Sequence, residues 1–456
     1  MAPSAVADPR ATGPTEPIRQ PRRRWSRSRA ARTVQDPGSA ALEKRLRPLY
    51  LTSFLQGFAL WYAVEKLFMR SIGLSDALIA LSTSIYIVVM MVANVPIGVL
   101  ADRWSRKGVL YLATIALACG SAVCGRAHSF LVFTIGISMW GLFYACYLGT
   151  FDAIVYDVVL EETGSAEGFE RHYGRVQMAE FLGSLGGALA SVLVVQLWTT
   201  RATFFLTVPI TCCAFISLRA FNEPLLHKAR KEPLSAHLGQ IVRAFLTNWT
   251  VARIVVCTVC AAQVLRLLFE FSQLWYLALG LPKYLYGPGC ALLSSGAVAG
   301  GYLASKLPIG WRAVLTTAIF TLAISSGLFV KVAPVVIAAQ MLTMAGIVIL
   351  TVILSRYLHD EMPSTIRTGA SSVAATAGYG VFVPVAIAFG LTSQHQGIFH
   401  ASWFVTGALI LLSAGLIILV VRARCADSNS RSAVGNGQHP SRSAVVEVGD
   451  RGEPIR

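Results

Sequence analysis

Long apolar runs, separated by short polar or charged segments, constrain this chain more than any other feature of its sequence. About 20 consecutive apolar residues are enough for a helix to cross the hydrocarbon core of a membrane. Runs of that length occur at about residues 49–70, 77–100, 108–127, 129–152, 174–198, 202–221, 250–279, 288–306, 312–331, 333–355, 368–392 and 398–421. A composition that is 55% hydrophobic and only 14% charged agrees with this reading. We predict an all-α integral membrane protein with twelve transmembrane helices.

The net charge of +16 could indicate a nucleic-acid-binding protein, but most of the basic residues lie in the terminal segments or in short loops between apolar runs. That distribution is typical of membrane topology. Because basic residues are concentrated in the loops of one side, we expect both termini in the cytoplasm, in a multi-pass protein of the plasma membrane. The expected partners are the lipid bilayer and a small molecule, with no nucleic acid and no second copy of the chain.

The longest polar loop divides the apolar runs into six and six. We predict a disordered basic tail over 1–47, a six-helix bundle over 48–222, a cytoplasmic linker over 223–248, a second six-helix bundle over 249–423 and a disordered tail over 424–456. The two halves carry traces of a repeat, because Gly73-Leu-Ser after the first span matches Gly280-Leu-Pro after the seventh. The same offset places Gln56 on Gln263. Two pseudo-symmetric bundles are therefore expected.

The segment Gly98-Val-Leu-Ala-Asp-Arg-Trp-Ser-Arg-Lys107 places one acid and three bases between the second and third spans. Serine and glycine would be enough for solubility, so we expect these charges to have partners. Asp102 could lie against the positive end of the helix that starts near Pro363, as a contact that breaks in each transport cycle (a latch). Such contacts contribute about 0.3–1 kcal/mol, and up to about 2 when partly buried. The alternative is a segment that only sets loop orientation.

Two six-span halves with this charged segment between spans two and three resemble the major facilitator superfamily of secondary transporters. The family pattern Gly-x-x-x-Asp-Arg/Lys-x-Gly-Arg/Lys-Arg/Lys is matched by Gly98, Asp102, Arg103, Arg106 and Lys107, while Ser105 replaces the usual glycine. Asp157 and Arg175 look like the family's charged partners for this segment. The resemblance implies alternating access by two rocking halves and no enzymatic activity.

By the same resemblance, spans one, four, seven and ten line a central cavity, and spans five and eight pack the halves together. Span five contains Gly183 and Gly187, and span eight contains Gly296 and Gly300. Both pairs have the GxxxG spacing that lets helix backbones approach closely. We expect these glycines to serve helix packing where the halves meet.

Span seven carries the clearest candidates for substrate or proton binding. Arg266 lies near the bilayer midplane with Glu270 one turn further on, and a charge at that depth must face protein or a wet cavity. The pair could neutralise itself, or Arg266 could hold an anion or modulate a proton-loading Glu270. Gln263 and Gln273 extend the same face, as Gln56 does on the corresponding face of span one.

Other candidates lie on spans one, four and five. Trp140, Tyr144, Tyr147 and Phe151 form one aromatic stripe, either as packing or as a tolerant wall for flat lipophilic compounds. Asp152 and Glu180 are acids near the cytoplasmic ends of their spans, suited to a proton site or to gating. Lys66 is interpreted as extending toward the outer membrane surface, with a substrate role as the alternative.

These features predict a secondary transporter that exports a small amphipathic solute in exchange for protons. No metal site and no cofactor is expected beyond the proton motive force. Uptake by proton or ion symport is the first alternative. A membrane sensor or lipid-handling protein without solute flux is the alternative of another class.

Overall fold

The computed structural model describes residues 37–165, 168–224, 249–306, 310–361 and 367–435, and this part of the chain is almost wholly helical. The first half contains α1 (Pro37–Gly57), η1 (Tyr62–Val64), α2 (Glu65–Ser71), α3 (Asp76–Arg103), α4 (Arg106–Arg126), α5 (Phe130–Tyr147), α6 (Thr150–Thr163), α7 (Phe169–Leu197) and α8 (Thr200–Arg219). The second contains α10 (Trp249–Ala278), η3 (Lys283–Leu285), α11 (Tyr286–Ala304), α12 (Trp311–Ser325), η4 (Ser326–Phe329), α13 (Ala333–Glu361), α14 (Arg367–Gln396) and α15 (Ile398–Gly435). Each predicted span coincides with one helix or with consecutive helices, so the predicted fold class is confirmed.

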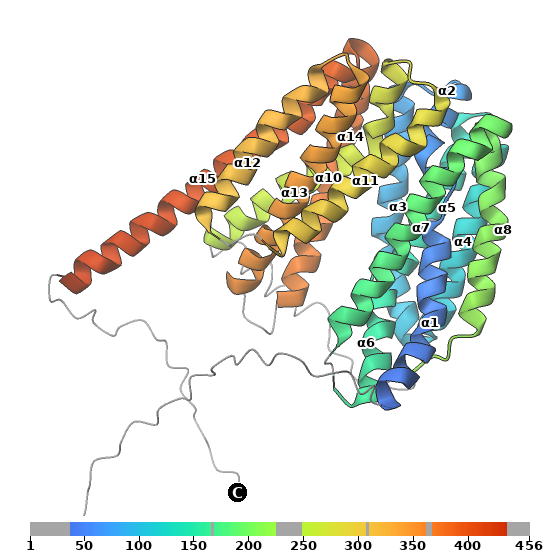
Figure 1. Ribbon diagram of the computed structural model, residues 1–456, viewed down its shortest axis with the longest axis horizontal. Helices are drawn as coiled ribbons and strands as arrows, with labels where there is room; N and C mark the ends of the chain where they lie inside the picture. The colour runs from blue at the N-terminus through green and yellow to red at the C-terminus, as the bar shows by residue number, and fades with distance from the viewer. Residues whose placement is uncertain (1–36, 166–167, 225–248, 307–309, 362–366, 436–456) are drawn as a thin grey trace, which may run out of the picture.

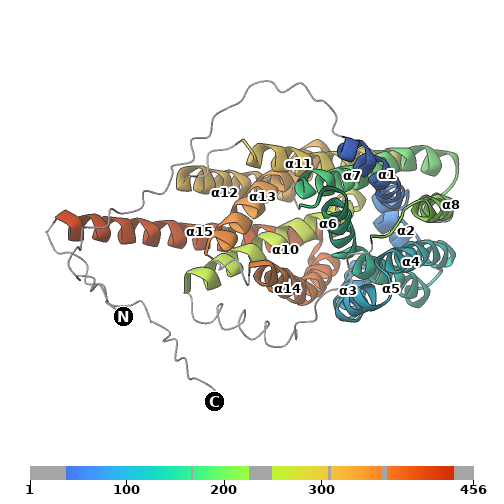
Figure 2. The ribbon, with the colours of Figure 1, turned by 90° about the horizontal axis from the view of Figure 1, so that it is seen from below.

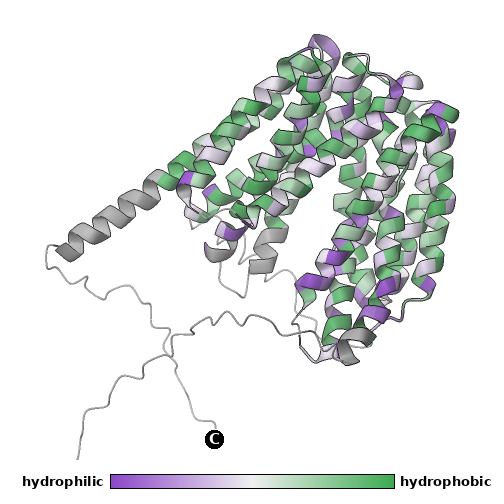
Figure 3. Ribbon diagram, viewed as in Figure 1, coloured by the Kyte–Doolittle hydropathy of each residue, from purple (hydrophilic) through white to green (hydrophobic). Residues whose placement is uncertain are grey.

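Hydropathy supports insertion of both halves in a membrane. Ten segments of the described chain are long and apolar enough to cross one, and α5 with α6 counts as a single span of 34 residues. The other two predicted spans correspond to α1–α2 and to α11. Hydrophobic residues cover most of the helix surfaces (Figure 3), and exposed side chains such as Leu197, Ile216 and Leu411 are in position to meet lipid.

The sequence repeat has a structural counterpart. Gly73 and Gly280 both adopt positive φ, at 87° and 62°, directly after the first and seventh spans. The Lys66 backbone N–H donates to Gln273 Oε1 at 3.0 Å, and these residues are 207 positions apart, the same offset as the two glycines. Equivalent positions of the two halves therefore meet near the pseudo-two-fold axis.

The two halves lie side by side, with α3 against α14 and α7 against α11 (Figure 2). Their ribbons converge toward the end that carries α2 and separate toward the end that carries α6 (Figure 1). We call these the closed end and the open end. At the closed end Ser393 Oγ donates to Asp76 Oδ2 at 2.7 Å, and a Cβ on Gly390 would lie 2.3 Å from Ala80 Cβ. Close helix packing thus seals this end.

The predicted tail boundaries differ from the structure. Residues 37–47, expected in a disordered tail, form the first turns of α1. They are held by ion pairs to other helices, Glu43 with Arg175 and Arg45 with Glu162. At the other terminus α15 continues to Gly435, past the expected boundary at 424. Residues 225–248, most of the predicted linker, lie outside the described chain.

The first span is broken, although its sequence predicts a continuous helix. α1 ends at Gly57, and the chain resumes helical structure only at η1 and α2. Inside a membrane, irregular backbone needs protein partners. Here Leu60 N donates to Thr207 Oγ1 at 3.2 Å, and Gln273 Nε2 donates to the Tyr62 carbonyl at 2.8 Å. Side chains from α8 and α10 therefore make the break possible.

The four GxxxG glycines pack helices within each half. A Cβ on Gly183 would lie 2.1 Å from the Phe54 carbonyl oxygen of α1, and one on Gly296 would lie 2.2 Å from the Met341 carbonyl oxygen of α13. Gly187 faces Ala59 in the break after α1, and Gly300 faces Ala345 of α13. The expectation that they pack the halves together is wrong. Close approach between α7 and α11 occurs instead at Gly287, against Ala188.

The fit at Gly183 leads to a prediction. Gly183→Ala is expected to destabilise the fold by about 1–3 kcal/mol, because the new methyl group meets backbone that cannot rotate away. Gly174→Ala on the same helix is the matched control, since nothing lies within 4 Å of a Cβ there. Thermal unfolding of the detergent-purified variants measures the difference. Equal melting temperatures for the two variants would contradict the packing described here.

Candidate transport cavity

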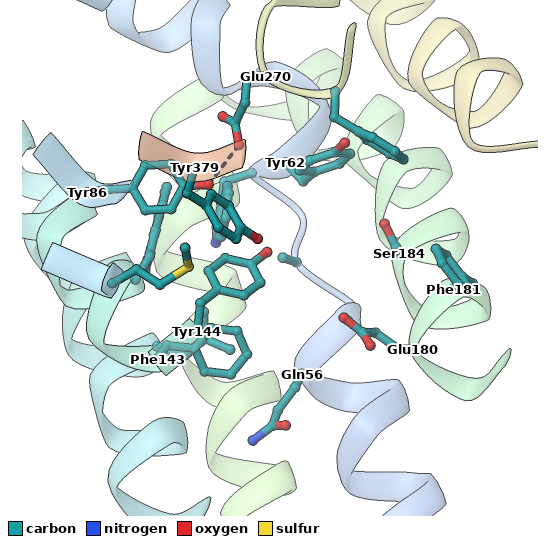
Figure 4. Close-up of a pocket in the computed structure, with 17 residues that line it drawn as sticks. Gln56, Tyr62, Tyr86, Phe143, Tyr144, Glu180, Phe181, Ser184, Glu270 and Tyr379 are labelled. Carbon is teal, nitrogen blue, oxygen red and sulfur yellow. Dashed lines mark hydrogen bonds between the residues drawn. The ribbon is translucent and has the colours of Figure 1, made fainter. Parts of the chain in front are cut away.

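A cavity of about 260 Å³ lies between the two halves at the level of the break in span one (Figure 4). Its wall comes from both halves, on α1 and the break, α3, α4, α5, α7, α10 and α14. It is lined by Gln56, Gly57, Ala59, Trp61, Tyr62, Tyr86, Met90, Leu117, Trp140, Phe143, Tyr144, Glu180, Phe181, Ser184, Phe269, Glu270 and Tyr379. The site therefore combines aromatic rings with two carboxylates.

The aromatic part of the wall is built on the break. Trp61 stacks on Trp140 with ring centroids 3.6 Å apart and planes within 8°, and the nearly parallel ring of Phe204 lies about equally far from both, at 6.1 and 6.2 Å. Aromatic pairs contribute about 0.5–1.5 kcal/mol beyond their buried area. Of the predicted stripe on span four, Trp140 and Tyr144 line the cavity, whereas Tyr147 is buried outside its lining. The stripe thus provides both wall and packing.

Glu270 sits where the two halves meet. Its Oε1 accepts a hydrogen bond from the Tyr86 hydroxyl at 2.7 Å, and its Oε2 lies 3.9 Å from Lys66 Nζ. Lys66 Nζ also donates to Glu65 Oε1 at 2.9 Å. With its side chain only 1% exposed, Lys66 does not extend to the membrane surface, contrary to the sequence interpretation. Because Lys66 belongs to the first half and Glu270 to the second, this ion pair crosses the boundary between the halves.

Arg266 takes a different partner from the one that its spacing suggests. Its guanidinium lies over the Tyr379 ring, 3.6 Å from the centroid. Nη1 is buried without a hydrogen-bond partner among the described residues. The predicted alternative, an ion pair between Arg266 and Glu270, does not form. Instead Lys66 contacts Glu270 and Tyr379 contacts Arg266, both from other helices. Tyr379 lines the cavity, whereas Arg266 is not part of the lining.

The three glutamines divide between different tasks. Gln56 lines the cavity and donates from Nε2 to Thr114 Oγ1 at 2.9 Å. Gln263 donates to the Gly378 carbonyl at 3.0 Å, joining α10 to α14. Gln273 bonds to the broken span and thereby joins the two halves outside the cavity. Only Gln56 is placed to meet a solute here.

Glu180 is the second carboxylate of the cavity wall. Its Oε2 accepts a hydrogen bond from the Tyr147 hydroxyl at 2.7 Å. Ser53 Oγ lies 3.0 Å from the same hydroxyl and donates to the Val176 carbonyl. Asp152, the other acid predicted with it, lies outside the cavity at the start of α6, where its Oδ1 accepts the Ala153 N–H at 2.9 Å.

The charged segment is engaged within the first half. Arg106 pairs with Asp157 and, at 3.6 Å, with Asp102. Asp102 is 71% exposed, and Arg103 is exposed beside it. Residues 362–366, where the expected helix-end partner of Asp102 begins, lie outside the described chain, so the latch stays a prediction. Gly98 has nothing within 4 Å of a built Cβ.

Two partners of this segment differ from those expected. Arg175 pairs with Glu43 of α1 and not with the segment. Glu223, which sequence reasoning missed, accepts from the Lys107 N–H at 3.1 Å and from Ser105 Oγ at 2.7 Å. Ser105 Oγ also caps α4 by accepting the Gly108 N–H at 2.8 Å. The serine at the usual glycine position thus joins the segment to the end of the first half.

Comparison with known proteins agrees with this architecture. A family model described as the Major Facilitator Superfamily matches residues 48–386. The chain belongs to this superfamily. It is therefore a multi-pass membrane transporter by family and fold, and not an enzyme.

Individual relatives are distant. The MFS-type efflux transporter ffsH of Aspergillus flavipes is 25% identical over 189 residues, which are 41% of this chain and only 31% of that protein. The nucleoside transporter NupG superposes with a TM-score of 0.67 at 15% identity, over 82% of this chain and 98% of that one. A bacterial homologue of the human lysosomal transporter Spinster, inward-facing and unoccupied, gives 0.63 at 15% identity, over 89% and 100%. A D-xylose–proton symporter gives 0.61 at 14%, over 81% and 95%. At these identities the similarity establishes the fold alone.

Proposed function

We propose that this superfamily member exports small amphipathic molecules in exchange for protons. The observation that carries the proposal is Glu270, a carboxylate that lines the cavity and also pairs with Lys66 across the boundary between the halves. The Glu270 carboxylate can therefore contact a solute and bind a proton, and it also takes part in the ion pair that joins the two halves near the closed end. The expected setting is a monomer in the plasma membrane with both termini and the open end toward the cytoplasm, based on the bias of basic loop residues.

The arrangement of Lys66 explains how a proton could change the conformation. When Glu270 is ionised, Lys66 attracts it across the boundary at 3.9 Å. When Glu270 is protonated, that attraction is lost, but Lys66 keeps its closer partner Glu65 at 2.9 Å and is not left as an unpaired buried charge. Protonation therefore weakens the closed end at low cost. If proton binding and solute binding each shift the equilibrium between the two open conformations, the carrier can exchange protons for solute.

Proton-coupled uptake is the second candidate, because the fold also superposes on a nucleoside transporter and on a D-xylose–proton symporter. The aromatic wall and the distant efflux relative favour export. A membrane sensor without solute flux is the remaining alternative.

Proteoliposomes containing the full chain and a trapped pH-sensitive dye would test the proposal. With an imposed pH gradient, amphipathic compounds of a broad panel should cause proton movement opposite to their own. Proton movement in the same direction as the compound would indicate symport. Absence of proton-linked flux for every compound would overturn the proposed exchange for protons, and absence of any flux of the compounds themselves would favour the sensor.

The same assay tests the latch. Asp102→Asn is expected to change the stability by less than about 1 kcal/mol, because the carboxylate is mostly exposed. It should nevertheless slow proton-linked flux several-fold if Asp102 contacts the second half in another state. Glu170→Gln, at an exposed acid of α7 outside the charged segment, is the control for the loss of a negative charge. A correctly inserted Asp102→Asn protein with normal flux would leave only the role in loop orientation.

A further inference from the structure

We infer that the transported molecules are amphipathic cations and that Glu180 binds their cationic group. This inference rests on the proposed function and names its substrate class. It comes from the distribution of charge around the cavity. One of the two carboxylates in the lining has a nearby cation from the protein, and the other does not.

The lining of the cavity contains two acidic side chains, Glu180 and Glu270, and no basic one among the described residues. The two nearby bases, Lys66 and Arg266, lie outside the lining. Lys66 lies between Glu65 and Glu270, and Arg266 is covered by the ring of Tyr379. A solute that enters this space therefore meets negative charge.

The two carboxylates differ in their compensation. Glu270 has the Lys66 ammonium group within 4 Å. Glu180 has no ion pair within that distance in the described part of the chain, and its hydrogen-bond partner is the neutral hydroxyl of Tyr147. Glu180 is partly exposed in the cavity, and a solute that packs over its carboxylate would remove it from water, which is costly without a countercharge. A bound organic cation would supply a countercharge at Glu180, where no base lies within 4 Å in the described part of the chain, whereas Glu270 already shares Lys66 with Glu65.

The surroundings of Glu180 suit such a ligand. Its carboxylate is oriented by Tyr147, which is in turn held by Ser53. Figure 4 shows Glu180 and Glu270 on different sides of the cavity, with Tyr62, Tyr144 and Tyr379 between them. Aromatic faces attract cations, with contributions of about 0.5–2 kcal/mol. The apolar part of an amphipathic cation would pack on the stacked pair Trp61 and Trp140.

The test is equilibrium binding of three probes to the purified full chain: the near-isosteric ions tetraphenylphosphonium and tetraphenylborate, and the smaller neutral triphenylphosphine oxide. The wild-type protein should bind the phosphonium cation more tightly than the borate anion. Glu180→Gln should weaken phosphonium binding by about ten-fold or more, equivalent to ~1.4 kcal/mol, and should leave binding of the neutral oxide nearly unchanged. Glu170→Gln, the same substitution at an exposed site of α7, should leave all three affinities unchanged.

The inference is overturned if the wild-type protein binds tetraphenylborate as tightly as tetraphenylphosphonium, a comparison that needs no variant and so holds even if Glu180→Gln fails to fold. It is also overturned if Glu180→Gln keeps the wild-type affinity for the cation. Binding is measured without a pH gradient. Charge-selective binding together with absent proton-linked flux would therefore reject the proposed function and leave the cation site standing.

Discussion

Lys66→Met is expected to destabilise the protein by about 3–5 kcal/mol, the range observed when one partner of a buried ion pair is removed. Lys66 is the cation shared by Glu65 and Glu270, and its side chain is 1% exposed. Methionine preserves the length of the side chain but leaves the buried Glu65 and the partly exposed Glu270 without compensation. Thermal unfolding in detergent at neutral pH measures the loss.

A second substitution separates charge from packing. Lys66→Met combined with Glu65→Gln should recover much of the lost stability, because one of the two uncompensated charges is then removed. Lys331→Met, at an exposed lysine, is the matched control and should unfold as the wild type does. If Lys66→Met alone matches the wild-type melting temperature, the buried cluster does not hold the closed end as described.

Glu270→Gln is expected to abolish solute accumulation driven by a pH gradient while preserving exchange of solute across the membrane. Glutamine keeps the size of the side chain and can still bond to the Tyr86 hydroxyl, whose oxygen lies 2.7 Å from Glu270 Oε1. It cannot gain or lose a proton, so the attraction to Lys66 no longer depends on the pH of either side. Proteoliposomes with and without an imposed gradient distinguish the two activities.

Glu361→Gln, at an exposed position of the second half, is the control and should keep gradient-driven accumulation. Glu270→Gln should also keep the charge selectivity of probe binding that Glu180→Gln loses. Undiminished accumulation by Glu270→Gln would show that another group carries the proton. Loss of probe binding in this variant would instead mean that Glu270, and not Glu180, binds the cation.

The sequence by itself determined the class of fold, the twelve spans, their division into halves and the position of the charged segment. These are local properties, because the membrane requires about 20 apolar residues per span regardless of what each helix packs against. The repeat was also visible, since Gly73 and Gly280 each follow a span and each adopt a conformation that favours glycine.

The tertiary structure alone decided which partner each buried charge takes. The spacing of Arg266 and Glu270 suggests a pair on one helix, but Tyr379 and Lys66 reach them from α14 and α2. The break in span one follows the same principle, because its backbone is satisfied by Thr207 and Gln273 from distant helices. A polar side chain in an apolar interior interacts with whichever partner the fold brings within about 3–4 Å. That distance depends on the packing of elements far apart in the chain, which hydropathy and spacing do not encode.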